Sequence, residues 1–475
     1  MDQTRRKFIK DSLITAGAFS ILPSTAILAQ KNRNGIKSAF PSDKINMAFV
    51  GIGNQAGWDL RNFMATGLVN NVAMCDVDMG GQQTLENMKK YPNVPRFQDF
   101  RKMFDKMSNK IDAVCIGVPD FSHFPVTMLA MSLGKHVYVE KPLSRTFQES
   151  ELLMKAEKKY KVVTQMGNQG HSGANYFQFK AWVEAGIIKD VTKVTAHMNG
   201  ARRWHGWDTS MTSFPQGQPI PETMDWDTWL TIAQHHDYNK DFVNGQWRCW
   251  YDFGMGALGD WGAHIIDTIH QFLDLGLPYE VDPIKIEGPN SLFFPQASTL
   301  EFKFPKRKKM PPLTITWYDG VKNIPEVPKG YGKCKLDPNI PAPSTGKIQP
   351  STLNPGKEIY SKDLTFKGGS HSSTLSIIPE EAAEAMKSKL PEVPKSPSNH
   401  HENFVKSVMG QEETRSPFSI SGPLSQVLVL GTLAQRLGTK LKFDRKGKKI
   451  TNNDFANQLL TGTPPRKGWE EYYKL

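Results

Sequence analysis

The fold is set by residues 45–56, which read Ile45-Asn46-Met47-Ala48-Phe49-Val50-Gly51-Ile52-Gly53-Asn54-Gln55-Ala56. The apolar run predicts a buried strand, and the pattern G-x-G-x-x-G/A follows it before a stretch compatible with a helix. The first glycine permits a tight turn, the second lets a pyrophosphate approach the backbone, and the small third residue lets helix and strand pack closely. The stretch therefore predicts the first unit of a parallel, doubly wound sheet that binds a dinucleotide.

A second strand is predicted at 71–75, and it runs directly into Asp76. An acidic residue at this strand end, about 20 residues after the glycines, is placed to bind the ribose hydroxyls and to repel a 2′-phosphate. Asp76 therefore favours NAD over NADP, although a helix cap or turn would explain it too. Strands at 111–118 and 137–139, separated by a helix over 125–133, continue the alternation to about residue 164 and support an α/β sheet of the Rossmann type.

Two short motifs suggest chemistry. Glu140-Lys141-Pro142 ends the strand at 137–139, and the ends of such strands hold ligands, so Lys141 could hydrogen-bond a substrate hydroxyl and shuttle its proton. The alternative is a solvated turn. Asp260 and His264 are four residues apart in a glycine-rich stretch and would share one helix face. A carboxylate that stabilises the charged imidazole makes His264 a candidate general base, although such pairs are more often structural contacts.

The second half of the chain predicts an α+β domain with an open, mostly antiparallel sheet. Strand-like segments lie at residues 191–198, 284–287, 298–304 and 313–318. Residues 305–397 are rich in Pro, Gly, Ser and Lys and are interpreted as an insertion of long loops decorating that sheet. Helices are expected at 400–409 and 424–437, and a closing strand at 440–443.

The N-terminus has the composition of a targeting segment. Thr4-Arg5-Arg6-Lys7-Phe8 precedes an apolar stretch over 13–28, and Ala29-Gln30 is a plausible cleavage point. This pattern predicts a twin-arginine signal peptide at 1–29, a linker at 30–44, passage through the Tat export machinery and a periplasmic location. A membrane anchor is the alternative, but Gly17 and Pro23 make the stretch a poor spanning segment, so no stable membrane insertion is expected.

Charge and cysteine usage exclude some classes of function. The formal charge of +12 is concentrated in surface-type runs at 306–309 and 445–449, which are explained by solvated turns or by attraction to an acidic polymer. No nucleic-acid-binding motif accompanies the charge. The cysteines at 75, 115, 249 and 334 show no metal spacing, and no metal is predicted; a disulfide between Cys249 and Cys334 stays open.

In this combination and order, the motifs resemble the glucose–fructose oxidoreductase, inositol dehydrogenase and rhizopine-catabolism (Gfo/Idh/MocA) family. The family fold implies an NAD-binding Rossmann domain at 45–165 and a C-terminal α/β domain at 166–475, with the insertion at 305–397. The sheet of the second domain often serves oligomerisation, so a homo-oligomer is expected. Residues 165–169 resemble an exported, Bacteroidetes-like branch, whereas the insertion has no counterpart in compact members of the family.

The resemblance also assigns roles to residues. It implies that Lys141 contacts the reacting hydroxyl, that His264 exchanges its proton, and that Asp260 orients this pair. The cofactor-binding candidates are Gly51, Ile52, Gly53, Asn54, Gln55, Ala56, Asp76, Pro119, His123, Glu140, Lys141 and Asn168. Aromatic faces stack on sugar rings and arginines bind hydroxyls or carboxylates, so the substrate candidates are Arg202, Trp204, Arg248 and Trp250, with core packing as the alternative.

We therefore expect an exported, NAD-dependent oxidoreductase that acts on a hydroxyl of a sugar, polyol or glycoside and keeps its cofactor bound. One alternative is a glycosidase that oxidises a ring carbon transiently, eliminates the glycosidic bond and restores the hydride. The resemblance implies that such relatives tend to lose the lysine of the Glu-Lys-Pro motif, so Lys141 favours dehydrogenation. The other alternative is a non-catalytic sugar-binding protein on the same fold.

Overall fold

The computed structural model describes residues 44–198, 208–308, 310–320, 322–332 and 353–475. The first half of the chain forms a six-stranded sheet in the order β3-β2-β1-β4-β5-β6, with every neighbouring pair parallel. Its strands are β1 (Ile45–Val50), β2 (Val69–Cys75), β3 (Arg96–Phe97), β4 (Ala113–Ile116), β5 (His136–Glu140) and β6 (Thr164–Gly167). The predicted doubly wound sheet is confirmed, and its strand order reverses between β1 and β4, where such sheets bind ligands.

Both faces of this sheet are buried, as parallel sheets require. In β1, Met47 and Phe49 belong to one apolar cluster, and Ala48 and Val50 belong to the other. The connecting helices that supply these layers are α3 (Asn54–Ala65), α4 (Gln82–Lys90), α5 (Phe100–Met107), α6 (His123–Ser132) and α7 (Phe147–Tyr160). A late helix, α13 (His400–Val408), returns to the sheet and packs beside α3, contributing Phe404 to the first cluster.

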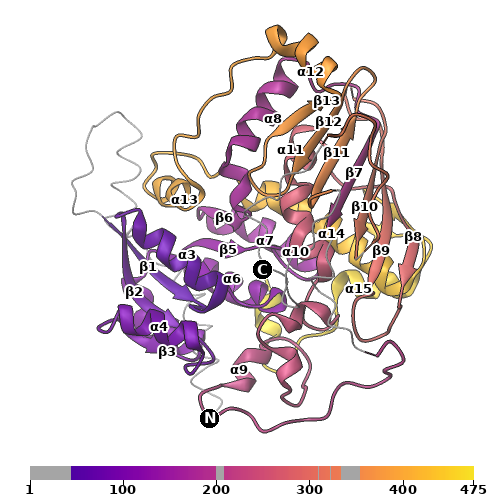
Figure 1. Ribbon diagram of the computed structural model, residues 1–475. Helices are drawn as coiled ribbons and strands as arrows, with labels where there is room; N and C mark the ends of the chain where they lie inside the picture. The colour runs from indigo at the N-terminus through magenta and orange to yellow at the C-terminus, as the bar shows by residue number, and fades with distance from the viewer. Residues whose placement is uncertain (1–43, 199–207, 309, 321, 333–352) are drawn as a thin grey trace.

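The second half forms a nine-stranded sheet in the order β13-β12-β11-β7-β10-β9-β8-β14-β15. The pairs are antiparallel except β7 with β10, so the expected mostly antiparallel sheet is confirmed. Its strands are β7 (Lys193–Met198), β8 (Glu280–Glu287), β9 (Ala297–Phe304), β10 (Leu313–Asp319), β11 (Gly356–Tyr360), β12 (Thr365–Gly369), β13 (Leu375–Ile378), β14 (Leu441–Asp444) and β15 (Lys449–Ile450). Figure 1 shows the two sheets side by side, with helices between them.

The interpretation of residues 305–397 as decorating loops was wrong in part. Strands β11, β12 and β13 lie in this stretch, and they complete one edge of the large sheet; helix α12 (Glu380–Met386) follows them. Each strand is only four or five residues long, and β12 ends in two glycines. Ile359, Phe366 and Ile377 are nevertheless buried in the main core, so tertiary packing overrides the weak local signal.

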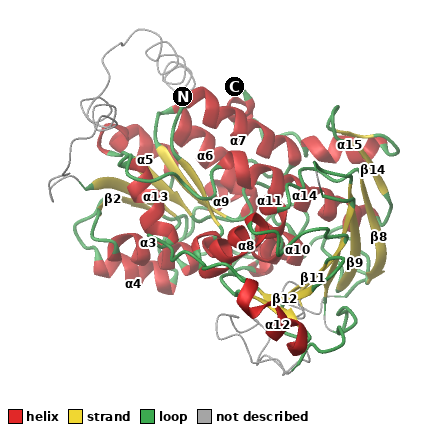
Figure 2. Cartoon of the chain, turned by 90° about the horizontal axis from the view of Figure 1, so that it is seen from above, coloured by secondary structure: helices red, strands yellow, loops and turns green. Residues whose placement is uncertain are grey.

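Two helices occupy the region between the sheets. They are α10 (Gly256–Ile265) and α14 (Phe418–Leu437), which lie between the two sheets in Figure 2. Both are buried along most of their length. The remaining α-helices of the described chain are α8 (Ala174–Glu184), α9 (Trp226–Leu230), α11 (Asp267–Phe272) and α15 (Asp454–Thr461). Helix α10 carries Asp260 and His264, and Asp260 contacts Lys141, which follows β5 of the parallel sheet. Across the described ranges, the helices lack the length and apolar character needed to span a membrane.

Candidate active site

A large cavity, of about 800 Å³, lies where the carboxyl ends of the parallel strands meet the second domain. Four groups of predicted residues line it: the glycine loop, the acid after β2, the lysine after β5, and the pair on α10. The predicted residues in its wall are Gly51, Gly53, Asn54, Gln55, Asp76, Pro119, His123, Glu140, Lys141, Arg248, Asp260 and His264. Segments far apart in the sequence therefore meet at one site.

The glycine loop has the shape that a dinucleotide needs. Gly51 has a φ of +83°, and a Cβ atom on it would lie 2.4 Å from the carbonyl oxygen of Gly117, so glycine is required there. Ala56 packs against Gly117, and it is buried, as expected for the small third residue. Helix α3 begins without a side-chain cap, which leaves its first N–H groups available to a phosphate. These features fit a dinucleotide at this loop.

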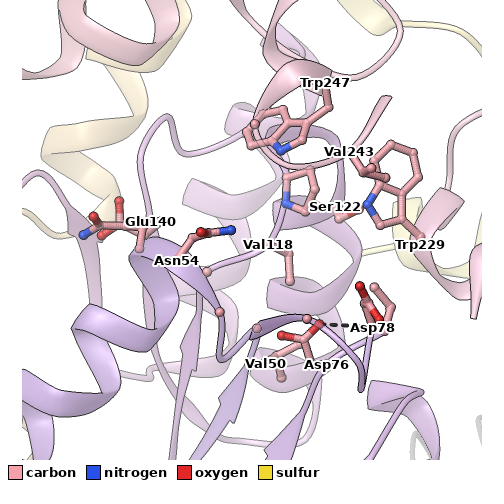
Figure 3. A pocket seen from close by; sticks show the side chains of 18 of the residues that line it. Val50, Asn54, Asp76, Asp78, Val118, Ser122, Glu140, Trp229, Val243 and Trp247 are labelled. Carbon is pink, nitrogen blue, oxygen red and sulfur yellow. Dashed lines mark hydrogen bonds between the residues drawn. The ribbon is translucent and has the colours of Figure 1, made fainter. Parts of the chain in front are cut away.

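Asp76 lies at the carboxyl end of β2, in the wall of the same cavity (Figure 3). Its carboxylate accepts hydrogen bonds from the backbone N–H of Ile52 at 3.0 Å, the backbone N–H of Asp78 at 3.1 Å and the hydroxyl of Thr84 at 3.3 Å. Burial raises the pKa of Asp76, and these hydrogen bonds oppose the rise. The residue is therefore fixed beside the glycine loop, where a ribose would lie.

Lys141 and Asp260 form a close ion pair. The Lys141 Nζ atom lies 2.7 Å from Oδ1 of Asp260 and 3.0 Å from its backbone oxygen, with side chains 11% and 3% exposed. Arg248 contributes a second positive charge, because its Nε atom lies 3.3 Å from the same carboxylate oxygen. Burial lowers the pKa of Lys141; Asp260 opposes this effect and Arg248 adds to it. A buried lysine of this kind exchanges a proton more readily than an exposed one.

Glu140, next to the lysine in the chain, belongs to a second buried group of acidic side chains. It accepts a hydrogen bond from Nε2 of Gln169 at 2.6 Å, and it neighbours Asp59 of α3. Burial raises the pKa of Asp59 to about 8, and burial together with the charge of Asp59 raises the pKa of Glu140. His401 of α13 closes the group, with Nε2 2.8 Å from Oδ1 of Asp59.

His264 lies in the cavity wall, and its ring is stacked on that of His371. The two ring centroids are 3.9 Å apart, with 21° between the ring planes. His371 follows β12 and was not singled out from the sequence, because it lies in the stretch interpreted as decorating loops. No sequence signal marks it; only the packing of that edge of the sheet brings it to α10.

The other predicted cofactor residues occupy different positions. His123 lines the cavity, and its ring nitrogens lie 2.7 Å from the carbonyl oxygen of Pro142 and 2.8 Å from that of Val118. Burial lowers the pKa of His123 to about 4, and the two carbonyl oxygens oppose this fall; the ring lies between the loops after β4 and β5. Asn168 is buried, with its amide 3.5 Å from Nδ1 of His171, and the next residue, Gln169, reaches the cavity.

Of the four substrate candidates, Arg248 lines the cavity, with its guanidinium 4.0 Å from the ring centroid of Trp247. Trp250 does not serve as predicted, because it is fully buried in the core and donates a hydrogen bond from Nε1 to the backbone oxygen of Asp241 at 2.8 Å. Trp247 is the tryptophan of this stretch that faces the cavity. Arg202 and Trp204 lie outside the described residues, as do the predicted signal peptide and Cys334.

Residues 221–245, which we call the covering segment, form the wall of the cavity opposite the glycine loop. The backbone oxygen of Thr223 accepts hydrogen bonds from the N–H of Met79 at 3.0 Å and from Nε2 of Gln98 at 2.9 Å, and its hydroxyl donates to Asp78 at 2.8 Å. Trp229 and Val243 of this segment face Glu140 across the cavity (Figure 3). The second domain thus covers one side of the cavity, and Thr223 hydrogen-bonds to the loop after β2.

Two family models match the chain. The model for the Gfo/Idh/MocA oxidoreductase family, NAD-binding Rossmann fold, matches residues 45–168, and that for the oxidoreductase family, C-terminal alpha/beta domain, matches residues 173–291. Among curated proteins, scyllo-inositol 2-dehydrogenase (NADP(+)) of Bacillus subtilis is 25% identical over 36% of this chain and 37% of its own. A glycosyl hydrolase family 109 protein of Shewanella pealeana is 25% identical over 43% of this chain and 48% of its own.

These curated matches therefore span less than half the length of either relative. Among solved structures, the WlbA dehydrogenase of Chromobacterium violaceum, in complex with NADH and UDP-GlcNAcA, aligns with a TM-score of 0.55 at 14% identity, over 86% of this chain and 99% of that one. The aldose-aldose oxidoreductase of Caulobacter crescentus aligns with a TM-score of 0.52 at 14% identity, over 84% of this chain and all of that one. The structural likeness supports the fold, and the family models together span just over half the chain. The chain therefore belongs to the Gfo/Idh/MocA family of NAD(P)-binding oxidoreductases.

Proposed function

We propose that this protein is an NAD-dependent oxidoreductase that acts on a hydroxyl group of a sugar, polyol or glycoside. One observation carries the proposal: the buried Lys141–Asp260 pair and His264 line the same cavity as the glycine loop and Asp76. The dinucleotide at the loop would supply the acceptor for the hydride. The protein must then bind the hydroxyl, hold its oxygen and remove its proton.

Lys141 and His264 are the groups suited to the hydroxyl proton. Lys141 is buried and its pKa is lowered, so its amine can donate a hydrogen bond to the hydroxyl oxygen and exchange a proton with it. The Lys141 ammonium donates hydrogen bonds to two oxygens of Asp260, one in its carboxylate and one in its backbone, and these bonds fix the lysine in place. His264 offers an imidazole on the same wall, a group whose ordinary pKa is close to neutrality.

The preference for NAD is proposed to rest on Asp76. Its carboxylate is held by Ile52 of the glycine loop, so a negative charge stands at the place where NADP carries its 2′-phosphate. The covering segment supports the further proposal that the cofactor stays bound between turnovers. Dissociation would require a path past Thr223 and its bonds to the loop after β2.

Export by the twin-arginine route is proposed from the sequence at 1–29 alone, since those residues lie outside the described ranges. It agrees with a retained cofactor, because the periplasm offers no replenished dinucleotide pool. The predicted homo-oligomer and the exported Bacteroidetes-like branch likewise remain proposals.

A second candidate is a redox-neutral glycosidase. The observation that favours it is the presence of glycosyl hydrolase family 109 proteins among the relatives, one of them 29% identical over 31% of this chain, from Parabacteroides distasonis. Both candidates begin with oxidation of a ring hydroxyl, so the same cavity would serve either one. The retained Lys141 favours the dehydrogenase.

One experiment separates these functions. The purified protein is incubated with a panel of aldoses, polyols and chromogenic glycosides, and two signals are followed: the absorbance of reduced nicotinamide and the release of the aglycone. A net increase in reduced nicotinamide supports the dehydrogenase. Aglycone release without net reduction, accompanied by exchange of the carbon-bound hydrogen with solvent deuterium, would replace it with the glycosidase. Sugar binding with neither signal would leave a non-catalytic binding protein.

A further inference from the structure

We propose that His371 is a positioning residue, whose ring sets the orientation of the His264 imidazole; this inference rests on the proposed function. The ring torsion of a histidine is broad, so the plane of an imidazole must be set by its neighbours. His371 supplies such a neighbour, because the two rings lie nearly parallel with centroids 3.9 Å apart. The edge of Trp261 lies against His371, with centroids 5.3 Å apart and planes at 85°.

The backbone around His371 is built to hold the ring in place. His371 has a φ of +50°, a left-handed conformation that is uncommon in residues other than glycine. The turn is closed by a hydrogen bond from the N–H of Ser373 to the oxygen of Ser370 at 3.1 Å. Next to it, Gln178 of α8 binds both the N–H and the oxygen of Leu375, at 2.6 and 3.0 Å. The turn is thus anchored from two sides.

The same turn also packs directly on the segment that follows the last strand of the parallel sheet. A Cβ atom added to Gly170 would lie 2.6 Å from the carbonyl oxygen of His371, so only glycine permits this approach. Gly170 lies in the short 3₁₀ helix η4 (Gln169–Ser172), which follows β6, and its neighbour Gln169 holds Glu140. His371 therefore connects three parts of the site: α10 through His264, the large sheet through β12, and the parallel sheet through Gly170.

His371 lines the same cavity as His264, and the effect assigned to it here acts through the plane of the His264 ring. A general base works only when its nitrogen faces the proton, and misplacement by about 1 Å can cost on the order of 100-fold in rate. Removing the His371 ring would take away the surface on which the plane of His264 is stacked. A flat apolar ring in its place would keep the stacking face, although it would lose the contact between Nδ1 of His371 and the hydroxyl of Ser370 at 2.9 Å.

The experiment compares His371→Asn with His371→Phe in the full protein. Asparagine suits the left-handed backbone but removes the ring, whereas phenylalanine keeps a ring but suits that backbone poorly. Backbone strain alone therefore predicts that the asparagine variant is the better enzyme, and ring stacking predicts the opposite. His235→Ala is the control, because the His235 side chain is 73% exposed and pairs only with the exposed Asp237 among the contacts described.

We expect His371→Asn to lower kcat about 10- to 100-fold with little change in KM, and His371→Phe to stay close to the parent. An independent readout is the rate at which diethyl pyrocarbonate modifies His264, mapped by mass spectrometry. This rate should rise in His371→Asn and stay low in His371→Phe, whether or not the sugar panel contains a substrate.

Three results would overturn the assignment: a parental kcat in His371→Asn, unchanged modification of His264, or an equal loss of kcat in both variants, which would make the ring nitrogens essential. A parent that oxidises nothing in the panel contradicts the proposed function instead, and the modification rates still decide the stacking.

Discussion

Lys141 is the residue on which the proposed chemistry depends most directly. Its Nζ atom is buried against Asp260, and the two positive charges of Lys141 and Arg248 share one carboxylate. Such an arrangement keeps the ammonium form available while lowering the pKa of Lys141, which suits a group that must both donate a hydrogen bond and exchange a proton.

Replacing Lys141 with methionine should abolish most of the activity and leave the fold and the bound cofactor intact. General acid–base groups typically contribute about 100- to 10,000-fold in rate, so kcat should fall within that range. The matched control is Lys135→Met, at the opposite end of β5, whose Nζ donates to the backbone oxygen of Ser108 at 2.7 Å. Activity within tenfold of the parent in Lys141→Met, at an unchanged melting temperature, would remove Lys141 from the mechanism.

Replacing Asp76 with serine should relax the preference against NADP. The carboxylate is fixed beside the glycine loop, so its removal takes away the repulsion of a 2′-phosphate, and the affinity for NADP should rise relative to NAD. Calorimetric titration of the cofactor-free protein with both dinucleotides measures the ratio. Asp78→Ser removes a charge two residues away and should change the ratio less; equal effects would show that only the local charge matters and not the position of Asp76.

Residues that stand in recognisable motifs could be identified from the sequence, but their positions relative to one another depend on packing. Lys141, Asp260 and His264 stand in motifs whose spacing predicts helix and strand-end positions. Trp250 was placed among the substrate residues because the sequence does not distinguish a tryptophan of the core from one that lines a cavity, such as Trp247. His371 could not be identified, since its position depends on Gly170 and on strands whose local signals are weak.

At the scale of elements, the covering segment determines how the cofactor would enter and leave. It belongs to the second domain, yet its bonds from Thr223 run to the loop after β2 and to Gln98. The sequence predicted β1, β2, β4 and β5, which are rich in apolar residues, but it did not predict the two-residue β3 or the partly polar β6. It did not predict this segment, which contains only short helices such as α9 and acquires its role through contacts made across the cavity.

Weakening these bonds should speed cofactor release. Thr223→Val removes the hydroxyl that donates to Asp78, and Gln98→Leu removes the side-chain donor to Thr223, so the double variant should lose NAD(H) faster during gel filtration. The fluorescence decrease of bound NADH after dilution measures the rate. Thr451→Val, at an exposed threonine that bonds to Lys442, is the control. An unchanged release rate in the double variant would mean that the covering segment does not limit dissociation.

At the scale of the whole molecule, the site is assembled from distant parts of the chain, and buried charge joins them. Asp59 of α3, Glu140 at the end of β5 and His401 of α13 meet next to Lys141. Burial raises the pKa of Asp59 from an ordinary 3.8 to about 8, so the folded protein holds a proton there at neutral pH that the unfolded chain releases.

This buried proton should make stability depend on pH in a direction that can be tested. Between pH 3.8 and about 8 the folded state keeps the Asp59 proton, whereas the unfolded state has largely released it. The contribution of Asp59 to stability is therefore present at low pH and lost as the pH rises. Buried histidines such as His123, with its pKa lowered to about 4, act in the opposite direction as the pH falls, so the pH dependence of the parent alone cannot isolate the effect of Asp59.

The variant Asp59→Asn isolates this effect, because the amide resembles the protonated acid and does not titrate. We expect the melting temperature of Asp59→Asn, measured relative to the parent by calorimetry, to rise steadily from about pH 5 to about pH 8. A difference that stays constant over this range would show that Asp59 carries the same charge in the folded and unfolded states.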